Sequence, residues 1–251
     1  MISIHSRESL QDLKEWLSYK NFNLITLSKV AFIPARGGSK RLPGKNLMKF
    51  SGNPLLYYSI MFAIKSKTFS HIIVSSDDDE ILKYAESFGV AALKRPDSIA
   101  GDFSPTISAA QHALASLDSI DVSAFVTLQP TNPARVFDHL NQSLEKFYSS
   151  EESAVITVSE MNKKLGVLKE GKWQPQFYKP GQRSQDIEKL YYENGNLYIS
   201  RPEFIRSGNI FDTNSETLVI DAIPYAIDID TMEDFIIGES VFATYRSRID
   251  Y

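Results

Sequence analysis

The 251-residue sequence contains no cysteine. Disulfide bonds, thiol catalysis and thiolate metal sites are therefore excluded, which agrees with a cytoplasmic location. The sequence also has no apolar run long enough to span a bilayer, and its polar start lacks the apolar core of a signal peptide. The formal net charge is −4, so the surface as a whole does not attract nucleic acid or an anionic membrane. We expect a cytoplasmic globular protein that binds neither.

The common phosphate-binding motifs G-x-x-x-x-G-K-[ST] and G-x-G-x-x-G are missing after the first apolar segment. Glycines and cations gather there instead, in the run Arg36, Gly37, Gly38, Ser39, Lys40, Arg41, Gly44, Lys45 and Asn46. Glycine permits positive φ angles and a close approach of backbone N–H groups to a ligand. Arginine and lysine supply charge for phosphates. Because ligands of open α/β sheets bind at the carboxyl ends of strands, we predict a polyanion site here rather than a basic surface turn.

Apolar segments near residues 30, 71, 90 and 124 alternate with segments of helical pattern. This alternation predicts βαβ crossovers and a mainly parallel sheet. We therefore expect a doubly wound, Rossmann-like α/β/α sandwich over residues 29–251. Residues 1–28, in which Leu10, Leu13, Trp16 and Leu17 share one helical face, are expected to form an added helix.

Three consecutive aspartates, Asp77 to Asp79, stand at the head of a predicted helix. Carboxylates in this position cap free N–H groups and interact favourably with the helix dipole. A metal site is the alternative, but side chains one position apart on a helix do not converge on one ion. We expect capping. At the next helix, Ser104 is the expected cap and Pro105 the first helical residue.

A second acidic pair, Asp228 and Asp230, alternates with isoleucines near the carboxyl end of the sequence. In a strand, residues two apart share a face, so both carboxylates would point the same way while the isoleucines enter the core. Like charges side by side repel unless a cation neutralises them, which favours a Mg²⁺ site. The alternative is that Asp230 only caps the final helix, which is expected to begin near Met232.

Several segments resemble motifs of the acylneuraminate cytidylyltransferases, also called CMP-sialic acid synthetases. In chain order these are the loop 35–46, Arg95 with Pro96 followed by Asp102 and Thr106, the turn 129–135, the segments 181–186 and 193–199, and Asp228 with Asp230. Tyr192 departs from the pattern, because many sialic acid enzymes have arginine there. Asn194-Gly195 is also typical of a hairpin turn. The resemblance implies an α/β sandwich of the nucleotide-diphospho-sugar transferase type.

The resemblance further implies a nucleotidyltransferase that combines CTP with a nonulosonic acid to give the CMP-sugar and pyrophosphate. It implies catalytic roles for Arg36, Lys45 and Asp230, and Mg²⁺ ligation by Asp228 and Asp230. The implied nucleotide contacts are Arg36, Gly37, Gly38, Ser39, Lys45, Asn46, Arg95 and Thr106, and the implied sugar contacts are Gln129 and Arg183. Gln129 otherwise only braces its turn. An arm at about 160–205 would cross to a second subunit, so a homodimer is expected.

Two other interpretations stay open. One is a cytidylyltransferase for the eight-carbon sugar acid Kdo, or a nucleotidyltransferase for a sugar 1-phosphate. Kdo enzymes usually lack the Gly-Gly-Ser-Lys run, and sugar 1-phosphate enzymes usually have another loop. The other is a non-catalytic nucleotide-binding homologue, against which the intact Asp228 and Asp230 pair argues. Sialic, legionaminic and pseudaminic acids differ in groups that the arm would contact, so the sequence does not predict which one is used.

Overall fold

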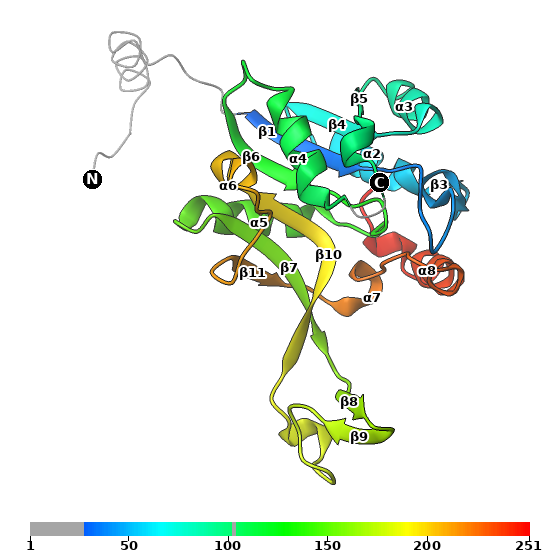
Figure 1. Cartoon of the computed structure of the whole chain (residues 1–251), viewed down its shortest axis with the longest axis vertical. Helices are drawn as coiled ribbons and strands as arrows, with labels where there is room; N and C mark the ends of the chain where they lie inside the picture. Colours follow the sequence, from blue (N-terminus) through cyan, green and yellow to red (C-terminus); the bar gives the residue numbers. More distant parts are fainter. Residues whose placement is uncertain (1–27, 102–103) are drawn as a thin grey trace.

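The computed structural model describes residues 28–101 and 104–251. In this part of the chain, a seven-stranded sheet with the order β11-β7-β10-β6-β1-β4-β5 forms the centre (Figure 1). Its strands are β1 (Ser28–Pro34), β4 (His71–Ser76), β5 (Ala91–Lys94), β6 (Val122–Thr127), β7 (Ala154–Met161), β10 (Leu190–Ser200) and β11 (Glu216–Val219). β10 runs antiparallel to both of its neighbours, and the other pairings are parallel. The predicted mainly parallel α/β architecture is confirmed.

The helices cover both faces of the sheet. Those with four or more residues are α2 (Leu55–Ser66), α3 (Asp79–Glu86), α4 (Thr106–Ala115), α5 (Phe137–Ser149), α6 (Pro202–Arg206), α7 (Ala222–Tyr225) and α8 (Met232–Thr244). In β1, Ala31 and Ile33 pack with α2, α3 and α5, whereas Val30 and Phe32 pack with α4 and α6. Side chains of a strand alternate between faces, so burial on both sides requires the continuous apolar run seen in the sequence.

Short elements complete the chain. They are the 3₁₀ turns η1 (Lys45–Leu47), η2 (Asp97–Ile99), η3 (Ser184–Asp186) and η4 (Arg246–Arg248), and the strand pairs β2 (Lys49–Phe50) with β3 (Asn53–Pro54) and β8 (Gly166–Lys169) with β9 (Lys172–Pro175). The helix expected in residues 1–28 falls almost entirely on residues 1–27, which lie outside the described residues. No described helix is both long enough and apolar enough to cross a membrane.

Two of the helix starts predicted from the sequence, those of α3 and α4, differ in outcome. The Asp78 carboxylate accepts hydrogen bonds from the N–H groups of Glu80 and Ile81, which confirms capping at the head of α3. At α4, Pro105 is the N-cap residue and makes no side-chain cap hydrogen bond, so the prediction of Ser104 as cap is wrong by one position. The fixed φ angle of proline prepares the turn without a capping side chain.

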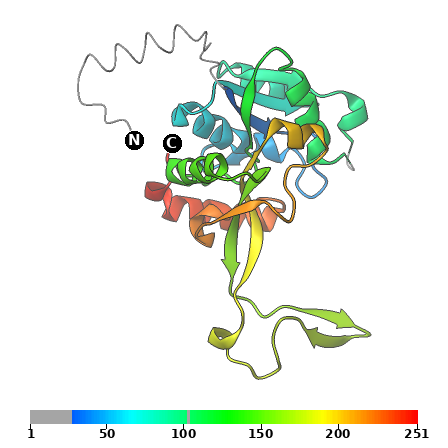
Figure 2. The same cartoon turned by 90° about the vertical axis from the view of Figure 1, so that its left-hand side faces the viewer.

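An arm projects from the domain, as both views show (Figures 1 and 2). β7 and β10 leave the sheet together as an antiparallel ribbon, and the β8–β9 hairpin lies between them in sequence. Asn194-Gly195 lies inside β10, so the alternative of a hairpin turn there is wrong. The pairing register shifts between Glu193 and Tyr198, because Asn194 is buried and its side chain bonds with β7 rather than with solvent.

Candidate active site

A polar cavity of about 280 Å³ opens at the carboxyl ends of β1, β5 and β6 and at the start of α4. Its lining comprises Pro34, Arg36, Lys45, Asn46, Arg95, Ser104, Pro105, Thr106, Gln129, Pro130 and Thr131. Six residues predicted from sequence for the nucleotide, catalysis or the sugar thus meet in one place, although they come from four separate segments. This is the position at which ligands of open α/β sheets bind.

The loop after β1 is held by its own neighbours. The side-chain amide of Asn46 donates to the Arg36 carbonyl at 2.8 Å, and the Gly37 N–H donates to Asp77 Oδ1 at 2.9 Å. Gly44 has a positive φ angle of 67°, but Gly37 and Gly38 do not, so of these three only Gly44 uses the positive φ that glycine permits. Gly37 is needed for another reason, since a Cβ atom there would lie 2.7 Å from the Cβ of Asp78.

Arg95 is buried at the edge of the cavity. Its guanidinium donates to the Ser75 carbonyl at 3.0 Å and to the Ser75 hydroxyl at 3.3 Å. Burial lowers the pKa of Arg95, the nearby Asp77 carboxylate raises it, and the charge of Arg36 lowers it. Two cations therefore face one cavity, an arrangement suited to a ligand with several negative charges.

Lys45 lines the cavity and pairs with Asp230, which is not one of the lining residues. Lys45 Nζ donates to Asp230 Oδ1 at 2.8 Å and to the Ile229 carbonyl at 3.0 Å. Arg41 donates to the other carboxylate oxygen of Asp230 at 2.6 Å. Lys45 has a side-chain exposure of 13%, so this ion pair is shielded more than an ordinary surface pair. The contact joins the first loop to a segment that lies far away in the sequence.

The segment that carries Asp228 and Asp230 is not a strand, contrary to the sequence-based expectation. The Ile229 N–H donates to the Thr131 carbonyl at 2.9 Å, so this backbone bonds with the turn after β6 instead of joining the sheet. Ile229 is nevertheless buried in the core, as expected. Thr231 caps α8, and its N–H bonds with the Asp234 carboxylate, so Asp230 is not the cap.

The acidic pair suits a hard cation. The pKa of Asp228 is raised, first because the carboxyl group loses part of its hydration and also because Asp230 carries a like charge, whereas a hydrogen bond from Thr131 lowers it. Among the described residues, no group of three or more histidines and carboxylates could hold a metal ion. Mg²⁺ is commonly bound by one or two carboxylates together with substrate phosphates and water, so a third protein ligand is not required, but both oxygens of Asp230 already pair with Arg41 and Lys45.

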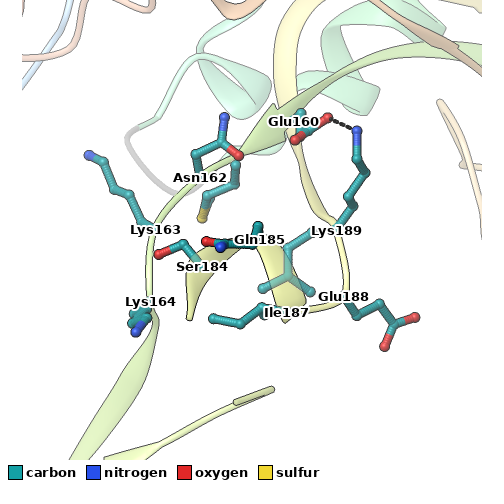
Figure 3. A pocket seen from close by; sticks show the side chains of 11 residues that line it. Glu160, Asn162, Lys163, Lys164, Ser184, Gln185, Ile187, Glu188 and Lys189 are labelled. Carbon is teal, nitrogen blue, oxygen red and sulfur yellow. Dashed lines mark hydrogen bonds and ion pairs between the residues drawn. The ribbon is translucent and has the colours of Figure 1, made fainter. Parts of the chain in front are cut away.

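Arg183, predicted to bind the sugar, lies on the arm and not in this cavity. It makes a two-point ion pair with Asp186, at 2.7 and 3.1 Å, and is exposed. A second cavity of about 420 Å³ lies where the β7–β10 ribbon opens toward η3, and Ser184, the residue after Arg183, is part of its lining (Figure 3). Lysines from both sides of the ribbon surround this cavity, and Lys189 pairs with Glu160 at 2.7 Å.

Arg135 is a site residue whose role we did not predict from the sequence. It is completely buried, and its guanidinium donates to the Gln129 carbonyl at 2.7 Å, the Asn196 carbonyl at 2.9 Å and the Ser59 hydroxyl at 3.0 Å. Burial lowers its pKa to about 10. Arg135 thereby fixes the turn that presents Gln129 to the cavity. An arginine two positions after the second proline of this turn was the available signal.

Two buried asparagines also brace the site and were not predicted. The amide of Asn132 donates to the carbonyls of Asn194 and Ile227, each at 2.9 Å. The amide of Asn196 donates to the carbonyls of Ala134 and Tyr225, at 2.8 and 2.7 Å. The two amides therefore link the turn after β6 and strand β10 to the segment that precedes Asp228. Sequence alone does not pair residues this far apart.

Comparisons with known proteins indicate the family of this chain. A family model described as cytidylyltransferase matches residues 30–246. A pseudaminic acid cytidylyltransferase of Campylobacter jejuni subsp. jejuni is 32% identical over 219 residues, covering 83% of this chain and 93% of that protein. A CMP-N,N'-diacetyllegionaminic acid synthase of Legionella pneumophila is 30% identical over 222 residues, covering 84% and 95%.

Among solved structures, a CMP:2-keto-3-deoxy-manno-octonic acid synthetase complexed with CTP is similar, with a TM-score of 0.64 and 15% identity. The likeness covers 86% of this chain and 99% of that one, and at this identity it concerns the fold. The family match, by contrast, extends over most of the described residues and includes every segment that lines the cavity. The chain therefore belongs to the cytidylyltransferase family.

Proposed function

We propose that this protein is a cytidylyltransferase that combines CTP with a nonulosonic acid to release pyrophosphate and the CMP-sugar. The observation that carries the proposal is the cavity in which Arg36, Lys45 and Arg95 meet at the ends of parallel strands. The names of the relatives, which include pseudaminic and legionaminic acid enzymes, support this substrate class. The proposed reaction is attack of the sugar's anomeric hydroxyl on the α-phosphate while pyrophosphate leaves.

Such a transfer needs alignment and charge neutralisation more than covalent catalysis. Arg36 and Lys45 would bind the triphosphate and offset the charge that grows on the leaving group. Lys45 is well placed for this role, because its ammonium group is already oriented by Asp230 and the Ile229 carbonyl. Gly38 and Ser39 would add backbone contacts to the phosphates.

The remaining nucleotide contacts would come from Arg95 and Thr106, with Gln129 turned toward the sugar. Asn46 lines the cavity, but its amide already donates to the Arg36 carbonyl, so it supports the loop as well as the ligand. Asp228 and Asp230 would hold Mg²⁺, which when bound polarises the α-phosphate and lowers the pKa of the attacking hydroxyl. Asp230 would then share its oxygens between the ion and the cations of Lys45 and Arg41.

We further propose a homodimer in which the arm covers the sugar site of the second copy. Large apolar side chains of the arm are exposed, including Leu168 at 72%, Phe177 at 67% and Trp173 at 51%. Contiguous exposed apolar groups are typical of interaction surfaces. In such a dimer Arg183 would approach the sugar carboxylate of the partner's site, for which a planar guanidinium is suited.

Pyrophosphate release tests the function. The protein is incubated with CTP and Mg²⁺ and a panel of sialic, legionaminic, pseudaminic and Kdo acids, with ATP, GTP and UTP as nucleotide controls. We expect release with CTP and one nonulosonic acid, and a mass spectrum that contains the CMP-sugar. Release with Kdo alone would favour the Kdo alternative. A protein that binds CTP but releases pyrophosphate with no acid would favour the non-catalytic homologue.

A further inference from the structure

The loop after β1, residues 35–46, is the proposed phosphate loop. One of its peptide groups is hydrogen-bonded at both of its polar atoms. It is the group between Arg36 and Gly37: its carbonyl accepts from Asn46 at 2.8 Å, and its N–H donates to Asp77 Oδ1 at 2.9 Å. A peptide group is planar, so two hydrogen bonds on opposite sides define its orientation. This orientation determines where the Arg36 side chain leaves the backbone and where the N–H groups after Gly37 point.

Asp77 is itself held on the far side of the loop. It connects β4 with α3, and its carbonyl accepts from Lys94 Nζ at 2.8 Å. The next residue, Asp78, donates its N–H to Ser76 at 3.0 Å and caps α3 with its side chain. The carboxylate that reaches Gly37 therefore projects from a rigid strand-to-helix corner. It contacts a segment that lies 40 positions earlier in the sequence.

The charge of Asp77 makes a direct role in phosphate binding unfavourable. The Asp77 carboxylate is close enough to Arg95 to raise the pKa of that guanidinium, whereas the like charge of Arg36 lowers it. A carboxylate beside a polyanion site repels the ligand, so its presence calls for a compensating benefit. Holding the Gly37 N–H in place provides one, because ordering the loop before the ligand arrives removes an entropic cost of binding.

We propose that Asp77 is a positioning residue that orders the phosphate loop for CTP, acting through its hydrogen bond to Gly37 and not through its charge. The inference rests on the proposed function in taking the CTP triphosphate as the ligand of this loop. The proposed role of Asp77 differs from the roles of the next two residues. Asp78 caps α3, and Asp79 forms an exposed ion pair with Lys94 at 2.7 Å.

The test compares three variants of the full chain by calorimetric titration with CTP and with cytidine. Asp77→Ala loses the acceptor, and we expect it to weaken CTP binding by about tenfold, or about 1.4 kcal/mol. Cytidine binding should change little, because cytidine lacks the phosphates. Asp77→Asn keeps an oxygen acceptor but loses the charge, so CTP should bind as in the wild type or more tightly. Asp79→Asn breaks the exposed ion pair and serves as the matched control.

Equal weakening by Asp77→Asn and Asp77→Ala would overturn the proposal, since charge would then be the cause. Unchanged CTP binding in Asp77→Ala, or equal losses for CTP and cytidine, would also overturn it. Thermal unfolding verifies that each variant is folded, and Asp77→Ser, whose hydroxyl is too short to reach Gly37, replaces the alanine variant if needed. A wild type that binds CTP without turnover contradicts the proposed function alone. One that binds no CTP is retested with inorganic tripolyphosphate, and failure there contradicts both.

Discussion

Arg135→Met is expected to destabilise the protein strongly, although methionine fits the same space without burying a charge. Arg135 is fully buried, and its three hydrogen bonds go to the Gln129 and Asn196 carbonyls and the Ser59 hydroxyl. At neutral pH the guanidinium remains protonated, because its pKa is lowered only to about 10. The substitution therefore replaces a buried cation by an apolar chain and removes three hydrogen bonds, although the Gln129 carbonyl keeps longer ones from the Asn132 N–H at 3.2 Å and the Ser59 hydroxyl at 3.3 Å.

A buried acceptor that loses its partner costs about 1–3 kcal/mol. The lower figure applies here, because methionine also removes the cost of burying a charge. At about 1 kcal/mol for each of the three lost hydrogen bonds, the free energy of unfolding falls by about 3 kcal/mol, on the scale of a typical total of about 5–15 kcal/mol. Since the Gln129 carbonyl is one of the three, we also expect turnover to fall more than the loss of folded protein explains.

Urea unfolding followed by circular dichroism measures the loss in the free energy of unfolding. The slope of this free energy against urea concentration should stay unchanged, which indicates that the transition is still two-state. Arg201→Met is the matched control: Arg201 also donates to two carbonyls, those of Ser150 and Glu152, but from a half-buried position. We expect it to cost less than about 1 kcal/mol, because water can replace the guanidinium. If the Arg135 variant lost no more than the control, the hydrogen bonds would only offset the cost of burying the charge, and the reasoning would be wrong.

Three further predictions concern the loop, the acidic pair and one histidine. Asp230→Ala should abolish turnover yet retain CTP binding, because Lys45 keeps its charge; turnover in saturating Mg²⁺ would contradict the metal assignment. Gly37→Ala should weaken CTP binding at least tenfold, because the added Cβ would lie 2.7 Å from the Cβ of Asp78. In Gly38→Ala the added Cβ would have no neighbour within 4 Å, so the midpoint of thermal unfolding should stay unchanged. Burial lowers the pKa of His139 below its ordinary 6.5, so protonation favours the unfolded chain. The free energy of unfolding should therefore fall as pH drops below 6.5, and His139→Gln should flatten that slope in urea titrations at several pH values.

Local sequence patterns predicted the parallel sheet and the part of the site that lies at the ends of β1, β5 and β6. The apolar run at β1 is continuous because both of its faces are covered, and such runs alternating with helices predict parallel strands. Parallel strands end at one edge, so the loop after β1, Arg95 after β5 and Gln129 after β6 were placed together correctly. These inferences need only the order of elements along the chain.

The remaining features depend on contacts between distant residues. Asn194-Gly195 has the composition of a hairpin turn, but burial against Thr157 and Ser159 keeps it inside a continuous strand. The segment of Asp228 looks like a strand, yet its backbone bonds with the turn after β6. In both cases a tertiary hydrogen bond overrides the local preference, because an unpaired buried polar group costs more than the propensity difference.

The sequence by itself determined the fold class and the cavity's cationic loop, because both follow from short-range periodicity and from residues adjacent in the chain, and its motifs indicated the family by resemblance. The tertiary structure decided which residues hold that loop and how the acidic pair is oriented. Asp77 and Lys45 take their roles from partners 40 and 185 positions away. No local pattern specifies such pairs, since only the packing of strands and helices sets the distance between them.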